Sequence, residues 1–267
     1  METRRLKNIA ILILLLLNAF LLLLLGYQYL QAEEAARDTR EQLSVLFASQ
    51  ELELSAQADL SQSPLSPLVL SRHQEGEAAM AESLLGGPVT AASQGGGIVT
   101  YTGEAGSIQF RSGGGFDGGE LTRDVEDAAG FVREFCQNYG YEDVDIQLTG
   151  GDGAVTAQQY VAGVPIAGCG LTLTFQDGML TAVSGAHISL EGAATEESEP
   201  LNCVTALVRF LDYRRAAGVV CSRVEDISCV YQLQSSPSSL RLVPLWRIDT
   251  DTYAYYVDCA SGSVVRA

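Results

Sequence analysis

The hydrophobic positions of this 267-residue chain form one long continuous run near the N-terminus and shorter periodic groups after it. The long run is NIAILILLLLNAFLLLLLGYQYL, in which Asn18 is the only polar side chain between Ile9 and Leu25. A helix needs roughly 20 apolar residues to cross about 30 Å of hydrocarbon, so this run is long enough to span a membrane. No Ala-x-Ala cleavage spacing follows it, which favours an uncleaved signal anchor over a removed signal peptide.

The charges that flank the run predict its orientation. Arg4, Arg5 and Lys7 precede it, whereas two glutamates follow it. Lys and Arg are retained on the cytoplasmic side of a membrane. We therefore expect residues 1–8 to be a cytoplasmic tail and residues 9–30 to be a single transmembrane helix of the cell membrane. The rest of the chain would then be an extracellular domain.

Helical periodicity and its breaks organise the next part of the chain. Residues 31–58 contain strong helix formers without Gly or Pro, and Leu43, Leu46 and Phe47 share one face, which predicts a membrane-proximal helix. We interpret residues 59–119 as a linker that leads into the exterior domain. Its expected elements are a short helix at Glu75–Leu85, strands at Ile98–Tyr101 and Ser107–Arg111, and a flexible glycine-rich turn at 112–119.

From residue 120 onward, a helical stripe followed by alternating strands occurs twice. The first copy, 120–190, opens with LTRDVEDAAGFVREFCQNYG, in which Thr122 or Asp124 is the expected N-cap and Gly140 the expected stop. Its strands are expected at Val144–Leu148, Val155–Val161, Cys169–Phe175 and Met179–Ser184, with a hairpin turn at Asp177-Gly178 between the last two.

The acidic linker EGAATEESEP separates the second copy, residues 200–267. Its expected elements are a helix at Leu201–Ala217 and strands at Val224–Leu233, Leu240–Asp249 and Tyr253–Asp258. A helix packed on an antiparallel meander, used twice, is typical of an α+β architecture. The predicted fold is therefore a transmembrane helix followed by tandem modules, each a helix on its own antiparallel sheet.

Charge and cysteine content narrow the classes of partner and compartment. The net charge of −17 repels phosphate backbones and anionic headgroups, which excludes nucleic acid as a partner. The six cysteines all follow residue 135, and an even number outside the cell permits disulfides. Buried free thiols are an equal alternative. If bridges form, Cys136 on the helix and Cys169 on a strand are the candidate pair within the first module.

No residue pattern indicates catalysis, a cofactor or a metal site. The glycines at 113, 115 and 118 match G-x-G-x-x-G, but too few βαβ units follow for a dinucleotide fold. The two histidines, His73 and His187, belong to no recognised catalytic or metal-binding motif. The clustered carboxylates are expected at a helix N-terminus and in the acidic linker, where charges are ordinarily structural. We therefore predict a protein that is not an enzyme.

Three stretches resemble the YycH/YycI regulatory proteins, and the YycI-like branch in particular. They are RRLKNIAILILLLLNAFLLL at the start, AESLLGG with IVTYTGEAGSIQF further on, and VPLWRIDTDTYAYYVDCASGSVV at the end, which is also similar to a PepSY module. The resemblance implies a non-catalytic membrane protein that modulates a sensor histidine kinase of a cell-envelope two-component system. The kinase, together with a related accessory protein, would be its partner.

That resemblance places the contact in the anchor. An amide in lipid can hydrogen-bond to a neighbouring helix, so Asn18, with Phe20 beside it, is the predicted transmembrane contact. The alternative function is a PepSY-like protein that inhibits or assists an extracellular peptidase. The sign of regulation, the identity of the partner, the oligomeric state, the cysteine pairing and any ligand do not follow from the sequence.

Overall fold

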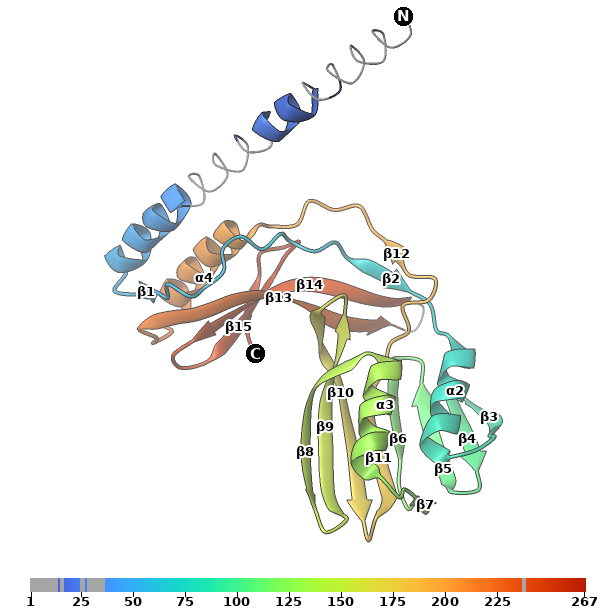
Figure 1. Cartoon of the computed structure of the whole chain (residues 1–267). Helices are drawn as coiled ribbons and strands as arrows, with labels where there is room; N and C mark the ends of the chain where they lie inside the picture. The colour runs from blue at the N-terminus through green and yellow to red at the C-terminus, as the bar shows by residue number, and fades with distance from the viewer. Residues whose placement is uncertain (1–13, 15–16, 25–26, 28–36, 237–238) are drawn as a thin grey trace, which may run out of the picture.

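The computed structural model describes residues 14, 17–24, 27, 37–236 and 239–267, and it shows two lobes (Figure 1). The lower lobe of Figure 1 contains two helices and strands β3–β11. The upper lobe contains helical residues 37–49, the short strands β1 and β2, and everything from β12 to the C-terminus.

The lower lobe is an antiparallel sheet in the order β8-β9-β10-β11-β6-β5-β4-β3. Its helices are α2 (Gln74–Leu85) and α3 (Ala128–Tyr139). Its strands are β3 (Thr90–Gly95), β4 (Ile98–Gly103), β5 (Gly106–Arg111), β6 (Gly115–Gly118), β7 (Arg123–Asp124), β8 (Tyr141–Thr149), β9 (Asp152–Val161), β10 (Val164–Gln176) and β11 (Met179–Ala186).

Both helices of the lower lobe cover the same face of this sheet. Met80 and Leu84 of α2 share one buried cluster with Val132 and Phe135 of α3 and with the inward-facing residues of the strands. Side chains alternate across a strand, and β9 and β10 accordingly bury every second residue over most of their length, whereas β3 is exposed throughout. The lower lobe therefore has one core, between its two helices and one face of the sheet.

The upper lobe is built around one long hairpin. Strands β13 (Arg223–Ser236) and β14 (Ser239–Thr250) pair along nearly their whole length. The outer side of β14 pairs with β2 (Leu68–Leu70) and then with β15 (Ala254–Asp258). The remaining elements are β1 (Glu53–Leu54), β12 (Ala194–Thr195), α4 (Cys203–Ala217) and β16 (Val264–Arg266). Distant parts of the sequence therefore meet at this hairpin.

The core of the upper lobe likewise combines both ends of the chain. Leu43 and Phe47 from helical residues 37–49 pack with Phe210 of α4 and with Trp246 of β14 in one buried cluster. Arg40 Nη2 donates to the carbonyls of Ser55, Ala56 and Ala58 at 2.8–2.9 Å, which fastens the helix to the turn after β1. Of the predicted face, Leu46 remains 39% exposed.

Strand β10 joins the two lobes. Its first half pairs in parallel with β13, at Ile166↔Tyr231 and Ala167↔Gln232. The register shifts before Gly170, and Gly168 has φ +85°, a left-handed conformation that glycine adopts without strain. The second half of β10 then lies between β9 and β11. The sheet is thereby continuous from β12 to β3 and mixed in direction.

The predicted fold class is wrong in its organisation. The strands do not form a separate antiparallel sheet in each of two tandem modules, because β10–β13 and β1–β13 pair in parallel and connect everything into one mixed sheet. The periodicity of an amphipathic strand shows that it is a strand and which side is apolar, but it does not show its neighbour.

The prediction of a transmembrane helix is also wrong. Within the described residues, no helix combines the length and the apolar character that crossing a membrane requires. The single-pass localisation rested on that helix and is corrected with it. Residues 1–13, including Arg4, Arg5 and Lys7, lie outside the described residues.

Candidate functional site

The meander β8–β11 with helix α3 is the most regular unit of the lower lobe. Asp127 caps α3 by accepting the Gly130 N–H at 2.9 Å, and the left-handed Gly140 ends it. The helix therefore begins later than the predicted caps Thr122 and Asp124, because Arg123–Asp124 instead forms β7 against β11. Eight meander residues are buried on the α3 side: Tyr141, Val155, Ala157, Leu171, Leu173, Phe175, Leu180 and Val183.

The opposite face of the meander is polar and open. Thr156 and Ser184 are exposed, and Thr172 and Thr174 are half-buried. Short hydroxyl side chains on adjacent strands leave this face flat, with donors and acceptors that water satisfies. Such a face suits a contact with another protein better than it suits a small molecule, which is ordinarily bound in a concave and largely apolar site.

The two hairpin tips of the meander are fastened to each other. Asp152 accepts the Asp177 N–H at 2.6 Å, and the Gly151 carbonyl accepts the Gly178 N–H at 3.1 Å. Asp177 and Gly178 both have positive φ, as a two-residue Asp-Gly hairpin requires. The predicted hairpin turn is confirmed, and its tip is held by a neighbouring hairpin.

A cleft of about 360 Å³ lies at the other end of the meander. It is formed by the start of α2, the end of α3, strand β9 and the segment 187–191 that follows β11. Both histidines of the chain, His73 and His187, line it. The sequence placed these two residues far apart, and the structure brings them to one cleft.

The buried side chain of Gln159 fixes one wall of this cleft. Its Nε2 donates to the Ile188 carbonyl at 2.8 Å, and its Oε1 accepts the Ile188 N–H at 2.9 Å. Gln159 is 3% exposed, so these two hydrogen bonds replace water for the amide and for the backbone of Ile188. The segment after β11 is thereby docked on β9 at a defined position.

His187 is neutral at physiological pH. Burial lowers its pKa to about 4, and a hydrogen bond to the Tyr139 backbone opposes this only in part. The rings of Tyr139 and Tyr141 lie 5.6 and 6.0 Å from the imidazole. His187 therefore acts as a packed aromatic side chain in the wall of the cleft.

His73 has a different role at the cleft rim. Its Nδ1 accepts the Gly76 N–H at 3.2 Å as the N-cap of α2, and its Nε2 lies 3.3 Å from Glu191. The imidazole therefore joins the start of α2 to the 187–191 segment.

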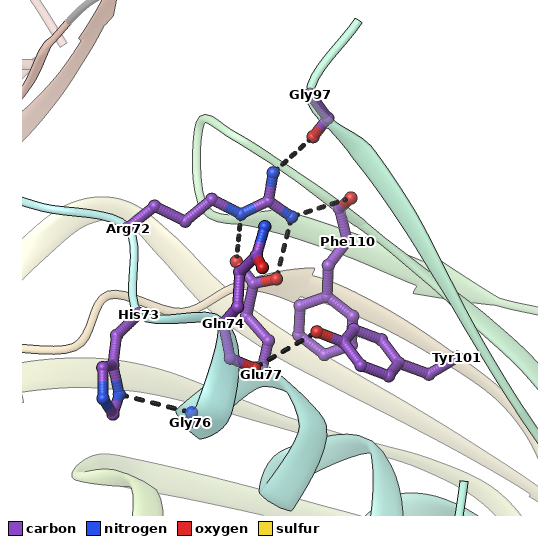
Figure 2. A network of polar contacts seen from close by, with 8 residues as sticks. All are labelled: Arg72, His73, Gln74, Gly76, Glu77, Gly97, Tyr101 and Phe110. Atoms are coloured by element: carbon purple, nitrogen blue, oxygen red, sulfur yellow. Dashed lines mark hydrogen bonds and ion pairs between the residues drawn. The ribbon is translucent and has the colours of Figure 1, made fainter. Parts of the chain in front are cut away.

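An arginine next to His73 clamps α2 onto the neighbouring strands (Figure 2). Arg72 binds both carboxylate oxygens of Glu77, at 2.7 and 2.8 Å, and donates to the Gly97 carbonyl at 2.6 Å. Both side chains are largely buried, at 20% and 13% exposed. A planar bidentate pair of this kind fixes orientation as well as distance, so the helix start cannot slide along the sheet.

The arrangement has the properties of a rigid binding surface. Within the described part of the chain, no group of three or more His, Cys, Asp or Glu is placed to hold a metal ion. The polar groups of the cleft hold α2, β9 and the 187–191 segment together. The meander and its cleft therefore present a fixed shape and hydrogen-bonding groups to whatever binds there.

The residues predicted to carry function do not come together. Asn18 and Phe20 are exposed helical residues, and Figure 1 shows residues 17–24 apart from both lobes. Cys136 and Cys169 are buried free thiols in different clusters, and the other four cysteines are buried free thiols in a third cluster. Burial raises the pKa of Cys136 to about 11 and that of Cys169 to about 12, so both stay protonated. Of the two alternatives that the sequence left open, a disulfide and free thiols, the structure has free thiols at both positions.

The sequence contains little that would have predicted which residues shape the cleft. Gln159 is one of two adjacent glutamines in a strand, and only the structure shows that it, rather than Gln158, faces the 187–191 backbone. Arg72 and Glu77 are five residues apart across a helix start, which is no recognised pair spacing. The two histidines could have been singled out only by their rarity.

Comparison with known families gives one match, inside this unit. Residues 147–186 match the Fungalysin/Thermolysin Propeptide Motif. The matched segment runs from the last residues of β8 to the end of β11, and it includes both fastened hairpin tips and Gln159. No curated protein matches the chain. The chain thus contains a motif that is found in peptidase propeptides.

Proposed function

We propose that this protein acts without catalysis, by binding a peptidase of the fungalysin or thermolysin kind and restraining it as a propeptide would. The observation that carries the proposal is the match over 147–186, which covers the last three residues of β8 and the whole of β9, β10 and β11.

The geometry of the meander supports this function. Its buried face is filled by α3, its tips are fastened, and its open face is flat and polar. A surface that is already ordered loses little conformational freedom on binding, and this favours affinity. The peptidase inhibitor or assistant was the alternative function from the sequence, and the match favours it over the kinase regulator. The kinase-regulator reading gains no support from the match and stays a prediction from resemblance.

The test is inhibition of thermolysin and of a fungalysin by the purified full-length chain. A short fluorogenic peptide reports peptidase activity, and gel electrophoresis reports whether the chain stays intact. We expect activity to fall with added chain until saturation, while the chain remains uncleaved. A second arm refolds each denatured peptidase with and without the chain, which detects assistance. No change in either activity or refolding yield would overturn the proposal.

A matched pair of variants localises the contact. Thr156→Arg places a long cation on the open face within the matched segment, and Thr102→Arg does so on β4, outside it. Both threonines are exposed, so both variants should fold normally. We expect Thr156→Arg to weaken inhibition and Thr102→Arg to leave it unchanged. Equal effects would place the contact outside the motif.

A further inference from the structure

Strand β8 presents the longest unpaired edge among the described strands. It has nine residues and pairs only with β9 in the described structure. The other strands that end a sheet path are shorter: β3 has six residues, β16 three and β12 two. An unpaired edge displays backbone N–H and carbonyl groups that another chain can use, and its length sets how many hydrogen bonds can form.

The side chains of β8 alternate between two chemistries. Ile146 pairs with the buried Val155, so it points to the α3 side, whereas Asp145 pairs with the exposed Thr156 and points to the open face. Ile146 is 38% exposed and Val144 is 37% exposed, although β-branched residues in a sheet are ordinarily covered by a cross-strand neighbour. A further strand on this edge would cover them.

The charged residues that surround β8 in the sequence are all acidic. Residues 134–208 contain no Lys or Arg and ten acidic residues. Three of the ten, Glu142, Asp143 and Asp145, lie on β8 itself. Tyr160 donates a hydrogen bond to Asp143, which holds that carboxylate at the edge. Natural edges are commonly protected by charge, and here the protecting charge is negative.

This charge also selects among occupants of the edge. A second copy of this chain, added edge to edge, would bring the carboxylates of two β8 strands together, and like charges on paired strands are destabilising. Glu142 and Asp145 both belong to this edge, and an extended segment that carries Lys or Arg would instead place a cation beside Asp145. The register shift of β8 lies between these two residues, so the uninterrupted stretch for pairing is Asp145–Thr149.

We infer that β8 accepts an extended basic segment of a partner protein as an added strand. The segment alternates basic residues, which face the open side with Asp145, and apolar residues, which cover Ile146. Backbone hydrogen bonds supply affinity in this mode of recognition, and alternate side chains supply specificity. The inference does not depend on the partner being a peptidase, and the peptide experiment below tests it without one.

The probe is a fluorescein-labelled peptide of alternating arginine and valine, eight residues long, whose binding to the full-length chain is followed by anisotropy. A fully N-methylated version keeps every side chain and charge but has no backbone donor. Several lost hydrogen bonds at about 1 kcal/mol each predict binding weaker by about tenfold or more. Equal binding of the two peptides, or no binding of either, would overturn the inference.

Two further measurements place the peptide on β8. Hydrogen exchange of alternate β8 amides should slow when the unmethylated peptide binds, while exchange in β3 should not change. Asp145→Arg should weaken binding roughly threefold, as expected for an exposed ion pair. Glu104→Arg makes the same charge change in the exposed β4–β5 turn, several strands away from β8 in the sheet, and should have a smaller effect. Binding without protection of β8 would show that the peptide is held elsewhere by charge alone, which would also overturn the inference.

Discussion

His187 is a histidine whose surroundings disfavour its charged form, and this links the stability of the lower lobe to pH. Its pKa in the folded protein is about 4, against an ordinary value of 6.5. Between these values the unfolded chain binds the proton more readily than the folded one does. The free energy of unfolding should therefore be fully present above about pH 6.5 and fall by up to about 3 kcal/mol as the pH drops towards 4.

The measurement is urea unfolding at several pH values from 7.5 to 4, for the parent chain and for His187→Phe. A phenyl ring can occupy the site between the Tyr139 and Tyr141 rings, and it does not titrate. The carboxylates of the two proteins titrate alike, so the difference between their curves isolates His187. Parallel curves across this pH window would show that the imidazole is not buried as described.

Single residues are also where sequence-based prediction of the site had least to work with. Asn18 stood out because it interrupts an apolar run, yet it is exposed and does not line the cleft between α2, α3 and β9. Gln159 forms the two hydrogen bonds that shape the cleft, yet it sits in an ordinary polar position of its strand. The role of a polar side chain depends on which backbone group passes it, and that is a property of the fold.

At the scale of elements, prediction from the sequence was much more successful. The helix expected at Glu75–Leu85 is α2, and the four strands expected between Val144 and Ser184 are β8–β11, longer by a few residues at most ends. These elements have strong local signals: period-two alternation, a left-handed glycine at a helix end, and an Asp-Gly turn. Strand β12 lies inside the predicted acidic linker and was not predicted, because a two-residue strand has no periodicity to detect.

The start of α2 offers a test of how an element is held in place. The bidentate pair of Arg72 and Glu77 is largely buried, and Arg72 also donates to the carbonyls of Gly97 in the β3–β4 turn and of Phe110 in β5. A double-mutant cycle with Arg72→Ala and Glu77→Ala should give a coupling free energy of about 1–3 kcal/mol in urea unfolding. Either single variant leaves a buried charge unpaired, so each should destabilise the protein more than the double variant does.

The matched control for this cycle is the exposed pair Arg247–Asp249, whose side chains are 44% and 30% exposed. Its coupling should stay within about 1 kcal/mol, as is usual for ion pairs at a surface. Similar coupling in both pairs would indicate that the Arg72 network is no more rigid than a surface contact.

At the scale of the whole molecule, the chain builds its upper lobe from segments that lie more than a hundred residues apart. Phe47 packs with Phe210, β1 pairs with β13, and β2 pairs with β14. The sequence predicted that residues 200–267 form a module of their own, because that stretch has a helix and three strands in order. A local pattern does not show which distant strand will pair with a given strand, so the long-range pairings could not be predicted.

The composition of the upper lobe predicts that residues 200–267 do not fold cooperatively alone. A fragment of these residues lacks Leu43 and Phe47, which fill the core over Trp246, and it lacks β1 and β2, which pair with the long hairpin. Removing one buried phenylalanine ordinarily costs about 3–5 kcal/mol, and a domain has only about 5–15 kcal/mol in total. We therefore expect a broad thermal transition and an exposed emission wavelength for Trp246, the only tryptophan.

The rescue experiment joins residues 37–70 to residues 200–267 through a flexible Gly/Ser linker. The fusion restores the helix, β1 and β2 to the lobe, while the lower lobe and its strand β10 remain absent. We expect a sharp melt and a buried Trp246, whose Nε1 donates to the Leu201 carbonyl at 2.7 Å in the full chain. Phe47→Ala in the same fusion serves as the control and should lower its melting temperature markedly. A cooperative melt of 200–267 without the N-terminal segment would contradict the prediction, because it would show that the core over Trp246 is complete without Leu43 and Phe47.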